Sequence, residues 1–518
     1  MTTKQLPGTV GAALALTAET HQQTAYICGE KKYSWQEVDA VTSNLALQFQ
    51  ALGLGKGDRI GVILLNQIEW IYTYFAAAKI GAVVVGMSVR YRDNEIDYML
   101  NDSRIKAVVS PREFAWFNYV KFFAEGRQRF PALQHCIYVG EPQAGDGVNF
   151  SDLLAPAKST TQQPAGALPA ADDLVMIIYT SGTTGQPKAA GLTHRSQLAS
   201  ARAQSQHNRM SPDDLMQLAM PLNHVGGITC GVLSMMLAGG CCELVPAFSP
   251  DAVLGMMQRH PPTLFVGVPT MITLLLMSPK LATADFSRVR LVIIGGSNVE
   301  AALLTRLQAA VPGVSIMNLY GLSESSGAIV MTPWDCSQDE LLGSIGKPLA
   351  GAAVRVVSAA GADMPVGEVG ELWFRGAGVI PAYVGAQQSP GTFDADGWLH
   401  SGDLGYLNGA GLIYLMGRQK DMYIQGGFNV YPAEIEGVIA MHPDVLMVAG
   451  IGVPDPVLGE VGRYYVIRKE GSSVTEQDVQ AFCRNRLADY KVPRHVVFRT
   501  QLPMTPAGKI QKAALRTE

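Results

Sequence analysis

Charge is scarce in this sequence, and its cysteines follow no metal-binding pattern. Charged residues make up 16% of the 518 positions and the formal net charge is −4, so a basic surface for nucleic acid is not expected. The seven cysteines contain no CxxC spacing, and the adjacent pair Cys241–Cys242 suits neither a metal site nor an ordinary disulfide. We therefore expect reduced, buried cysteines in a cytoplasmic protein.

Signals for secretion and for membrane insertion are also weak. Residues 1–7 lack the apolar core and cleavage site of a signal peptide, so secretion is not expected. The uncharged run from Val225 to Cys242 is about as long as a short membrane span, but several glycines interrupt it and no basic flank follows. We expect this run to be a helix buried beside a ligand pocket. The sequence leaves a peripheral membrane contact open for a lipid substrate.

The two commonest phosphate-binding signatures are missing. No Gly-x4-Gly-Lys-[Ser/Thr] motif occurs, because Gly508-Lys509 is followed by Ile510, whose side chain cannot bind magnesium. Glycines 53, 55 and 57 follow a helical pattern and precede a strand, which is the reverse of the order in a dinucleotide-binding fold. Any nucleotide site in this chain must therefore be of another kind.

Length and hydrophobicity indicate a large enzyme of at least two domains. The chain is 48% hydrophobic and too long for one compact core. A capping box, Ser34–Glu37, opens a helix, and buried strands alternate with helices over 59–139 and again from about Asp173 to Gly321. Strands of the second unit are predicted at Leu174–Ile178, Leu215–Ala219, Thr263–Val266, Leu291–Ile294 and Ser315–Asn318.

The pattern changes in the last third of the chain. After Gly343, short alternating segments predict a small, β-barrel-like subdomain of antiparallel strands. From Lys420 onward the pattern is that of a small α+β unit. The expected fold class is thus α/β, with a large domain over 1–419, made of two parallel-type α/β subdomains and the β subdomain, and a small domain over 420–518.

The stretch from Tyr179 to Lys188 has the composition of a phosphate-binding loop. It follows an apolar segment that we interpret as a strand buried on both faces. Glycines let several N–H groups point into one concavity, hydroxyl groups add donors, and a lysine supplies a positive charge. Turns share this composition, so the loop alone leaves an ordinary surface turn as the alternative. The residues predicted to bind phosphate are Thr180, Ser181, Gly182, Thr183, Thr184, Gly185 and Lys188.

This loop resembles the phosphate loop of the adenylate-forming (AMP-binding) superfamily, which includes acyl-CoA synthetases and aryl-CoA ligases. The other motifs of that superfamily follow in order and cover nearly the whole chain: Pro221-Leu222-Asn223-His224, Gly295-Gly296-Ser297, Tyr320-Gly321-Leu322-Ser323-Glu324, Ser401-Gly402-Asp403, Gly417-Arg418-Gln419-Lys420-Asp421 and Pro506-Ala507-Gly508-Lys509. Six ordered motifs make a chance match negligible.

The resemblance implies a reaction in two halves. A carboxylate attacks the α-phosphorus of ATP and gives an acyl adenylate and pyrophosphate, and a thiol, usually coenzyme A, then displaces AMP. Because the first half brings two anions together, catalysis has to come from positive charge and positioning. The resemblance implies that Lys509 is the adenylation lysine and that Glu324 binds Mg²⁺ beside the ATP phosphates.

The remaining roles follow from the same resemblance. Asp403 would accept hydrogen bonds from the ribose, with Arg418 beside the ribose or a phosphate, and Tyr320 would stack on adenine. Gly295, Gly296, Ser297, Gly321 and Ser323 would complete the nucleotide site, Gly295 and Gly321 also bordering the acid. His224, Val225 and Gly226 would line the acyl pocket, and the small residues after His224 suggest room for an extended or bulky apolar acid.

The small domain would be a mobile lid, with its hinge at Lys420. Gly426-Gly427 would admit the pantetheine arm of coenzyme A, although paired glycines are equally typical of a tight turn. Each of these residues also has an ordinary structural interpretation: Asp403 in a turn, Glu324 at a helix start, His224 in a core, and Arg418 and Lys509 as surface charges.

The function predicted from sequence is an AMP-forming acyl-CoA synthetase for a hydrophobic acid, favouring a medium or long aliphatic chain. The alternatives are an aryl-acid CoA ligase and an enzyme that loads a carrier protein or stops at the adenylate. A luciferase-like oxygenase and a regulatory protein without catalysis are more distant alternatives. ATP, Mg²⁺ and coenzyme A are expected, no nucleic-acid partner is, and homodimer formation is left open.

Overall fold

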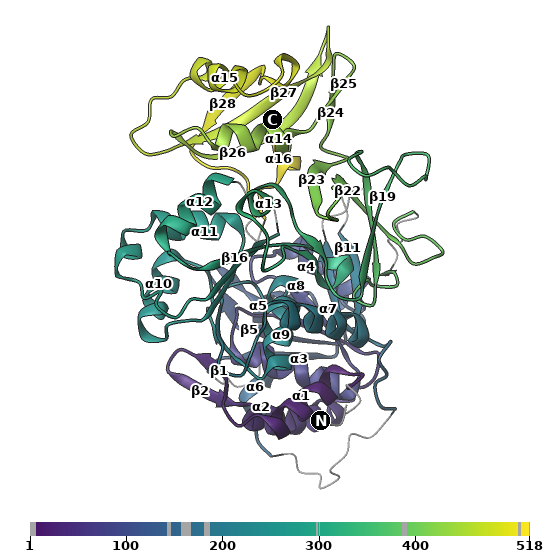
Figure 1. Cartoon of the computed structure of the whole chain (residues 1–518). Coiled ribbons are helices and arrows are strands. Elements are labelled where there is room, and N and C mark those ends of the chain that lie inside the picture. The colour runs from purple at the N-terminus through teal and green to yellow at the C-terminus, as the bar shows by residue number, and fades with distance from the viewer. Residues whose placement is uncertain are drawn as a thin grey trace.

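The computed structural model describes residues 7–141, 147–156, 167–180, 187–296, 299, 301–385, 391–505 and 509–516. Two large sheets form the body, with the small C-terminal domain standing above them (Figure 1). Within the described residues, no helix is both long and apolar enough to cross a bilayer, and all seven cysteines are free thiols, as expected.

The first sheet has eight strands, parallel in its centre. Its order is β21 (Tyr383–Val384), β11 (Lys188–Thr193), β10 (Leu174–Thr180), β4 (Val83–Met87), β3 (Arg59–Ile63), β5 (Ala107–Pro111), β8 (His135–Val139) and β9 (Val148–Asn149). Strands β11 and β21 run antiparallel at one edge.

The second sheet has nine strands and is again parallel in its centre. Its order is β18 (Lys347–Pro348), β17 (Gly327–Met331), β16 (Ser315–Leu322), β15 (Leu291–Gly295), β14 (Leu264–Gly267), β12 (Leu215–Leu218), β13 (Cys241–Leu244), β1 (Thr24–Cys28) and β2 (Lys31–Ser34). The two units predicted from sequence therefore do not match the two sheets, because β10 lies in the first sheet and β1 in the second. The strand predicted at Leu174–Ile178 pairs with β4 in the first sheet, so its assignment to the second unit is wrong.

Helices cover both sheets and fill the space between them. The shared core between the sheets contains α1 (Val10–Thr20), α2 (Trp35–Ala51), α3 (Ile68–Ile80), α7 (His194–His207), α8 (Val225–Gly227), the π-helix η2 (Ile228–Leu233) and α9 (Ser234–Ala238). The outer face of the first sheet packs on α4 (Asp93–Asp102) and α5 (Tyr119–Glu125). That of the second packs on α10 (Pro250–Arg259), α11 (Pro269–Met277) and α12 (Ala301–Ala310).

One local prediction about helices is confirmed, and a second is confirmed in part, because Cys241 and Cys242 at the end of the predicted helix begin β13. Ser34 and Glu37 form the capping box that opens α2. The uncharged run from Val225 is helical and buried down to Ala238, where Gly239 ends α9 in the left-handed conformation at φ 72°. Its middle is a π-helix, which no sequence pattern indicated.

The predicted β-barrel-like subdomain is an open sheet in the described residues. Its four antiparallel strands are β19 (Ala352–Val357), β20 (Gly370–Gly376), β22 (Leu399–Leu407) and β23 (Ile413–Arg418). The sheet packs on the body through Tyr320, Ile329 and Val330. The pairing thus places the Ser-Gly-Asp and Gly-Arg motifs side by side, because Asp403 and Arg418 are Cα partners across β22 and β23.

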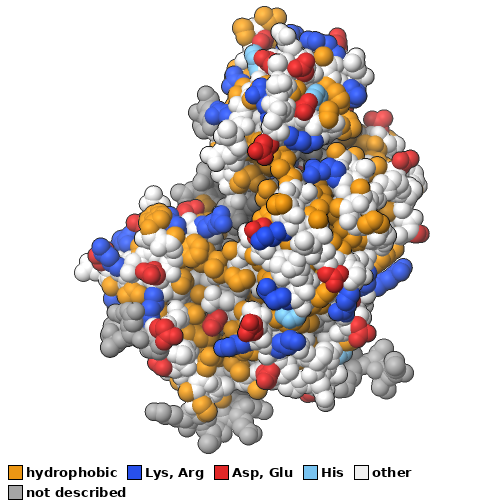
Figure 2. Space-filling view, turned by 90° about the vertical axis from the view of Figure 1, so that its left-hand side faces the viewer, with side chains coloured by type: hydrophobic (Ala, Val, Ile, Leu, Met, Phe, Trp, Pro, Cys, Tyr) orange, Lys and Arg blue, Asp and Glu red, His pale blue; other side chains and the backbone are white. Residues whose placement is uncertain are grey.

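The C-terminal domain is an α+β unit, as predicted. One sheet contains the strands β24 (Tyr423–Gln425), β25 (Phe428–Val430), β26 (Val445–Asp455), β27 (Gly459–Arg468) and β28 (His495–Arg499). It packs on α14 (Pro432–Ala440) and α15 (Glu476–Arg484), and the last helix of the chain is α16 (Lys512–Leu515). Figure 2 shows the surface hollowed between this domain, at the top of the view, and the body below it.

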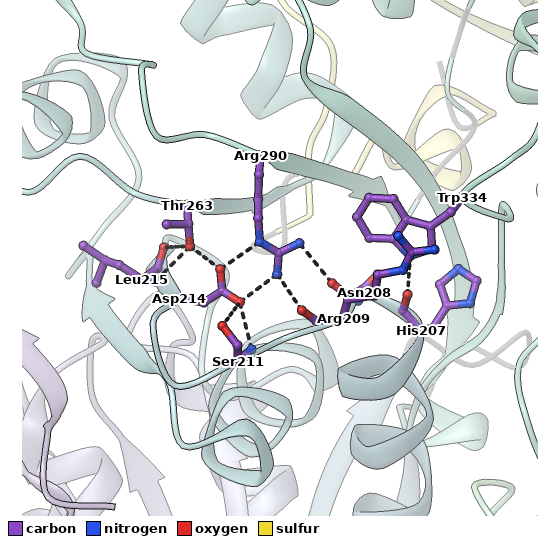
Figure 3. A network of polar contacts seen from close by, with 9 residues as sticks. All are labelled: His207, Asn208, Arg209, Ser211, Asp214, Leu215, Thr263, Arg290 and Trp334. Atoms are coloured by element: carbon purple, nitrogen blue, oxygen red, sulfur yellow. Dashed lines mark hydrogen bonds and ion pairs between the residues drawn. The ribbon is translucent and has the colours of Figure 1, made fainter.

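A buried ion pair ties the parallel strands of the second sheet at their amino ends (Figure 3). The Asp214 carboxylate, 4% exposed, accepts hydrogen bonds from Arg290 Nε (2.9 Å) and Nη2 (2.7 Å). It also accepts from Thr263 Oγ1 at 2.7 Å and from the Ser211 N–H at 2.9 Å. These residues precede β12, β14 and β15, so the carboxyl ends of the strands are left as the edge that can bind ligands.

Candidate active site

Asp403 lies at the centre of a buried polar cluster between the β subdomain and the body. Its side chain is 5% exposed and receives a hydrogen bond from the Tyr320 hydroxyl at 2.5 Å. Arg418 Nε lies 3.1 Å from the other carboxylate oxygen. Burial, and then the Asp403 carboxylate, raise the pKa of Tyr320 well above its usual range, so this hydroxyl is a fixed donor. The arrangement leaves the Asp403 carboxylate with acceptor capacity for further donors.

An irregular stretch of β22, where its pairing register with β20 shifts, sets the position of Asp403. The Ser401 hydroxyl donates to the Leu372 carbonyl at 2.6 Å and accepts from the Asp403 N–H at 3.0 Å. Gly402 has φ 71°, a left-handed conformation that favours glycine, and its N–H donates to Glu371 at 2.9 Å. Ser401-Gly402-Asp403 therefore lies inside β22 at this register shift, and not in the turn that is the ordinary alternative for the motif.

Glu324 lies just beyond β16 in a short 3-10 turn over Ser323–Ser325. The turn is held by Ser325, whose hydroxyl accepts from the Leu322 N–H at 2.9 Å and donates to the Gly327 carbonyl at 2.7 Å. Gly321 cannot carry a side chain here, because a Cβ would lie 2.0 Å from the Gly327 oxygen. The motif glycine is thus required by close backbone packing.

The side chain of Glu324 accepts a hydrogen bond from the Tyr383 hydroxyl. Its backbone carbonyl accepts from the Ile380 N–H at 2.8 Å, so one segment holds both ends of this residue. Within the described part of the chain, no cluster of three or more His, Cys, Asp or Glu side chains could enclose a metal ion. A single carboxylate fits Mg²⁺, which commonly takes one or two protein oxygens and completes its shell with phosphate and water.

The ends of the predicted phosphate loop are well anchored. Thr180 closes β10 and Lys188 opens β11, and the two are paired across the strands. Below them the Tyr179 hydroxyl donates to Asp102 at 2.6 Å, and the Tyr98 hydroxyl donates to the Pro187 carbonyl at 3.0 Å. The predicted binding residues Ser181, Gly182, Thr183, Thr184 and Gly185 lie outside the described residues.

The second glycine motif ends β15. A Cβ on Gly295 would lie 2.3 Å from the Leu319 oxygen, so this strand end must pack directly on its neighbour. Gly296 follows with φ 87°, and a Cβ there would meet Val268 Cγ1 at 3.2 Å and Lys509 Cε at 3.3 Å. Ser297 is outside the described residues.

Lys509 reaches this glycine from the C-terminal domain. Its N–H donates to Thr505 Oγ1 at 3.1 Å, and the Thr505 N–H donates to the Lys509 carbonyl at 2.7 Å; Pro506, Ala507 and Gly508 between them lie outside the described residues. Desolvation, and then the Arg418 guanidinium, lower the pKa of Lys509, whereas the Asp403 and Glu324 carboxylates oppose that shift. The motif lysine, the ribose candidate and the metal candidate therefore face one space, although they come from two domains.

His224 also borders this space. Its Nδ1 accepts from the Gly226 N–H at 3.1 Å and caps α8. Desolvation, and then the nearby Lys509 charge, lower the pKa of His224 to about 3, so the ring is neutral at physiological pH. Val225 is buried, while Gly227 has no room for a Cβ, which would lie 2.2 Å from the Pro221 oxygen. Gly226 is also crowded, because its Cβ would lie 2.8 Å from Met220 Cε. Gly227 thus serves close backbone packing and does not leave room for the acid, whereas Gly226 meets only the flexible end of the Met220 side chain at this distance.

Two lid predictions can be located in the fold. Lys420 is exposed in the connection between β23 and β24, and its carbonyl accepts from Arg516 at 3.0 Å. Gly426 and Gly427, at φ 58° and 88°, form the two-residue turn of the β24–β25 hairpin. The turn interpretation of the paired glycines is thus correct, and it leaves their proposed role toward coenzyme A as a prediction.

Sequence reasoning missed Tyr383, the partner of Glu324. It stands in a two-residue strand without a motif of its own, and only the pairing of β21 with β11 brings it to the site. No local pattern in the sequence marks it.

Comparison with known proteins agrees with this geometry. The model of the AMP-binding enzyme family matches residues 15–384, and that of the AMP-binding enzyme C-terminal domain matches residues 434–509. Feruloyl-CoA synthase of Amycolatopsis sp is 34% identical over 495 residues, covering 95% of each chain. The 3-[(3aS,4S,7aS)-7a-methyl-1,5-dioxo-octahydro-1H-inden-4-yl]propanoyl:CoA ligase of Rhodococcus jostii is 33% identical over 522 residues, covering 99% of each. The crystal structure of ATP-bound MatB from Rhodopseudomonas palustris superimposes with a TM-score of 0.87 at 30% identity, covering 99% of each chain.

Proposed function

Since this chain belongs to the AMP-binding enzyme family, we propose that it is an acyl-CoA synthetase that activates a hydrophobic carboxylic acid with ATP and passes the acyl group to coenzyme A. The observation that carries the proposal is the approach of Lys509 to Gly296 in the space faced by Asp403 and Glu324. A lysine with neighbouring carboxylates and an anchored loop is the set of groups that adenylation needs.

Each group has a role in the first half-reaction. Asp403, held by Tyr320 and Arg418, would accept the ribose hydroxyls and fix the nucleotide. Lys509 would donate to oxygens on which negative charge grows as the carboxylate attacks the α-phosphorus and pyrophosphate leaves. Mg²⁺ would neutralise phosphate charge when bound at Glu324.

The second half-reaction needs a thiol at the acyl carbonyl carbon of the adenylate. The sulfur of coenzyme A would attack the acyl carbonyl, with loss of its proton, and AMP would leave through cleavage of the C–O bond to phosphate. Gly426 and Gly427 lie on the lid hairpin, where a rotated lid would present them to the pantetheine arm. The predicted hinge at Lys420 is the exposed connection that such a rotation would use.

The acid itself is proposed only by class. The sequence favours an aliphatic acid of medium or long chain. The names of the relatives suggest an aryl or fused-ring acid as the alternative. Pyrophosphate release should be measured over short, medium, long, aryl, fused-ring and dicarboxylic acids, with and without coenzyme A. AMP release that requires a carrier protein instead of free coenzyme A would contradict the choice of acceptor.

The division of labour between the half-reactions is tested by Lys509→Ala. We expect adenylation to slow by about 10²–10³, the usual cost of one charge-stabilising donor. Thioester formation from preformed acyl adenylate should survive. Lys280→Ala is the control, because Lys280 forms an exposed ion pair with Asp251 on α10. Equal loss of both half-reactions in Lys509→Ala would refute the proposed role.

A further inference from the structure

Tyr383 connects two predicted parts of the ATP site that the sequence leaves unconnected. Its hydroxyl donates to Glu324 Oε1, and the ammonium of Lys188 lies 5.5 Å from the centre of its ring. That distance is within the range of an attractive cation–π contact. One side chain thus touches the proposed metal ligand and the lysine of the predicted phosphate loop.

The backbone fixes Tyr383 as firmly as its side chain does. Tyr383 is the Cα partner of Ala190 on β11, the strand that begins at Lys188. The Phe393 ring packs edge-on against it at 5.8 Å. Three residues earlier in the same segment, the Ile380 N–H holds the Glu324 carbonyl at 2.8 Å. Two separate contacts therefore join Glu324 to the segment that pairs with β11.

The hydrogen bond also decides which oxygen of Glu324 is free. A carboxylate has two oxygens, and the hydroxyl uses Oε1, which leaves Oε2 for another partner. A ligand carboxylate that is held by a second residue binds its metal in a defined orientation, and loss of such a partner commonly costs about 10–100-fold in metal affinity or activity.

We propose, on the basis of the function proposed above, that Tyr383 is a positioning residue that orients Glu324 toward a divalent cation on the ATP phosphates and couples this ligand to Lys188. Tyr383 does not touch the reacting atoms in this account. Its two contacts act on different quantities: the hydroxyl acts on the affinity for the cation, and the ring acts on the placement of Lys188.

The test measures binding and needs no turnover. Calorimetric titration of the full chain with ATP, without acid, in the presence and absence of Mn²⁺ gives the factor by which the cation strengthens ATP binding. Tyr383→Phe removes the hydroxyl and keeps the ring, so we expect that factor to fall about 10-fold or more. ATP affinity without the cation should stay within about twofold of wild type. Tyr383→Leu removes the ring as well and should weaken ATP binding even without the cation.

Two controls keep the outcomes separate. Tyr414→Phe makes the same chemical change at a tyrosine that stacks on Tyr406, away from Asp403 on the same pair of strands, and should leave both affinities unchanged. Glu324→Gln should abolish the effect of the cation. If the cation strengthens ATP binding as much in Tyr383→Phe as in wild type, and not at all in Glu324→Gln, the role of Tyr383 is overturned while the metal role of Glu324 stands. A wild-type effect in Glu324→Gln would overturn the metal role on which it depends, whereas acid-dependent pyrophosphate release tests the proposed function independently.

Discussion

Replacing Asp214 by alanine tests whether the buried ion pair of Figure 3 stabilises the second sheet. The change removes the acceptor of two Arg290 hydrogen bonds, at 2.9 and 2.7 Å, and of the Thr263 hydrogen bond at 2.7 Å. Arg290 is 33% exposed, and its remaining partners are the carbonyls of Asn208 and Arg209. Breaking one side of a buried pair typically costs about 3–5 kcal/mol, and we expect the lower end here, because Arg290 keeps two carbonyl partners and contact with water.

The effect is measurable by urea unfolding followed by tryptophan fluorescence. A loss of about 3 kcal/mol should lower the urea midpoint by about 1 M for a domain of this size. The matched control is Asp251→Ala, which breaks the exposed pair with Lys280 and should cost less than about 1 kcal/mol. Because Asp214 lies at the amino edge of the sheet, ATP binding by the folded protein should not change. A midpoint within error of the control would refute the argument.

Three further outcomes are expected. Although burial opposes ionisation, hydrogen bonds from Arg290 and Thr263 lower the pKa of Asp214. The contribution of its ionised form to the free energy of unfolding is therefore present above about pH 4 and is lost as the pH falls toward the folded-state pKa. Acid unfolding of Asp214→Asn should depend less on pH below about pH 4 than that of wild type. Burial lowers the pKa of His194 to about 4, whereas its pKa in the unfolded chain is about 6.5. Protonation of this ring should therefore reduce the free energy of unfolding of wild type by about 2 kcal/mol between pH 7 and pH 5. Urea titrations of His194→Gln should show a smaller reduction over the same range. Tyr320→Phe removes the donor to Asp403 and should raise the Kd for ATP about 10-fold in direct titration, with unchanged affinity counting against the ribose role.

Local signals in the sequence were sufficient for most elements of the fold. The capping box at Ser34 starts α2 as predicted, and the apolar run at Leu174 is a buried strand. Which strand pairs with which could not be predicted, because a buried strand has the same composition in either sheet. β10 therefore joins β4 across a long stretch of chain, and β1 pairs with β13 in the other sheet.

In the candidate site, too, motifs identified single residues, whereas the contacts between these residues became visible only in the structure. Asp403, Arg418 and Tyr320 were identified one by one through motifs, and the structure brings them within hydrogen-bonding distance. The small residues after His224 suggest free volume in the sequence, whereas a Cβ on Gly227 would lie 2.2 Å from the Pro221 oxygen. Tyr383 was missed because its importance arises only from the β11–β21 pairing. Sequence motifs locate residues that touch a ligand more readily than the residues that orient them.

The position of Lys509 gives a physical reason for placing this residue on a separate domain. Desolvation and Arg418 lower its pKa, so a permanently enclosed ammonium would be costly while the nucleotide is absent. The anionic phosphates of ATP supply the opposite charge that offsets this cost. On the mobile-lid role proposed above, a lysine on the C-terminal domain would enter when ATP is bound and leave once pyrophosphate has gone, which would free the cleft for a thiol. On this reasoning ATP should favour the closed arrangement of the two domains, and Lys509→Ala should weaken that preference in small-angle scattering, whereas Lys280→Ala should not.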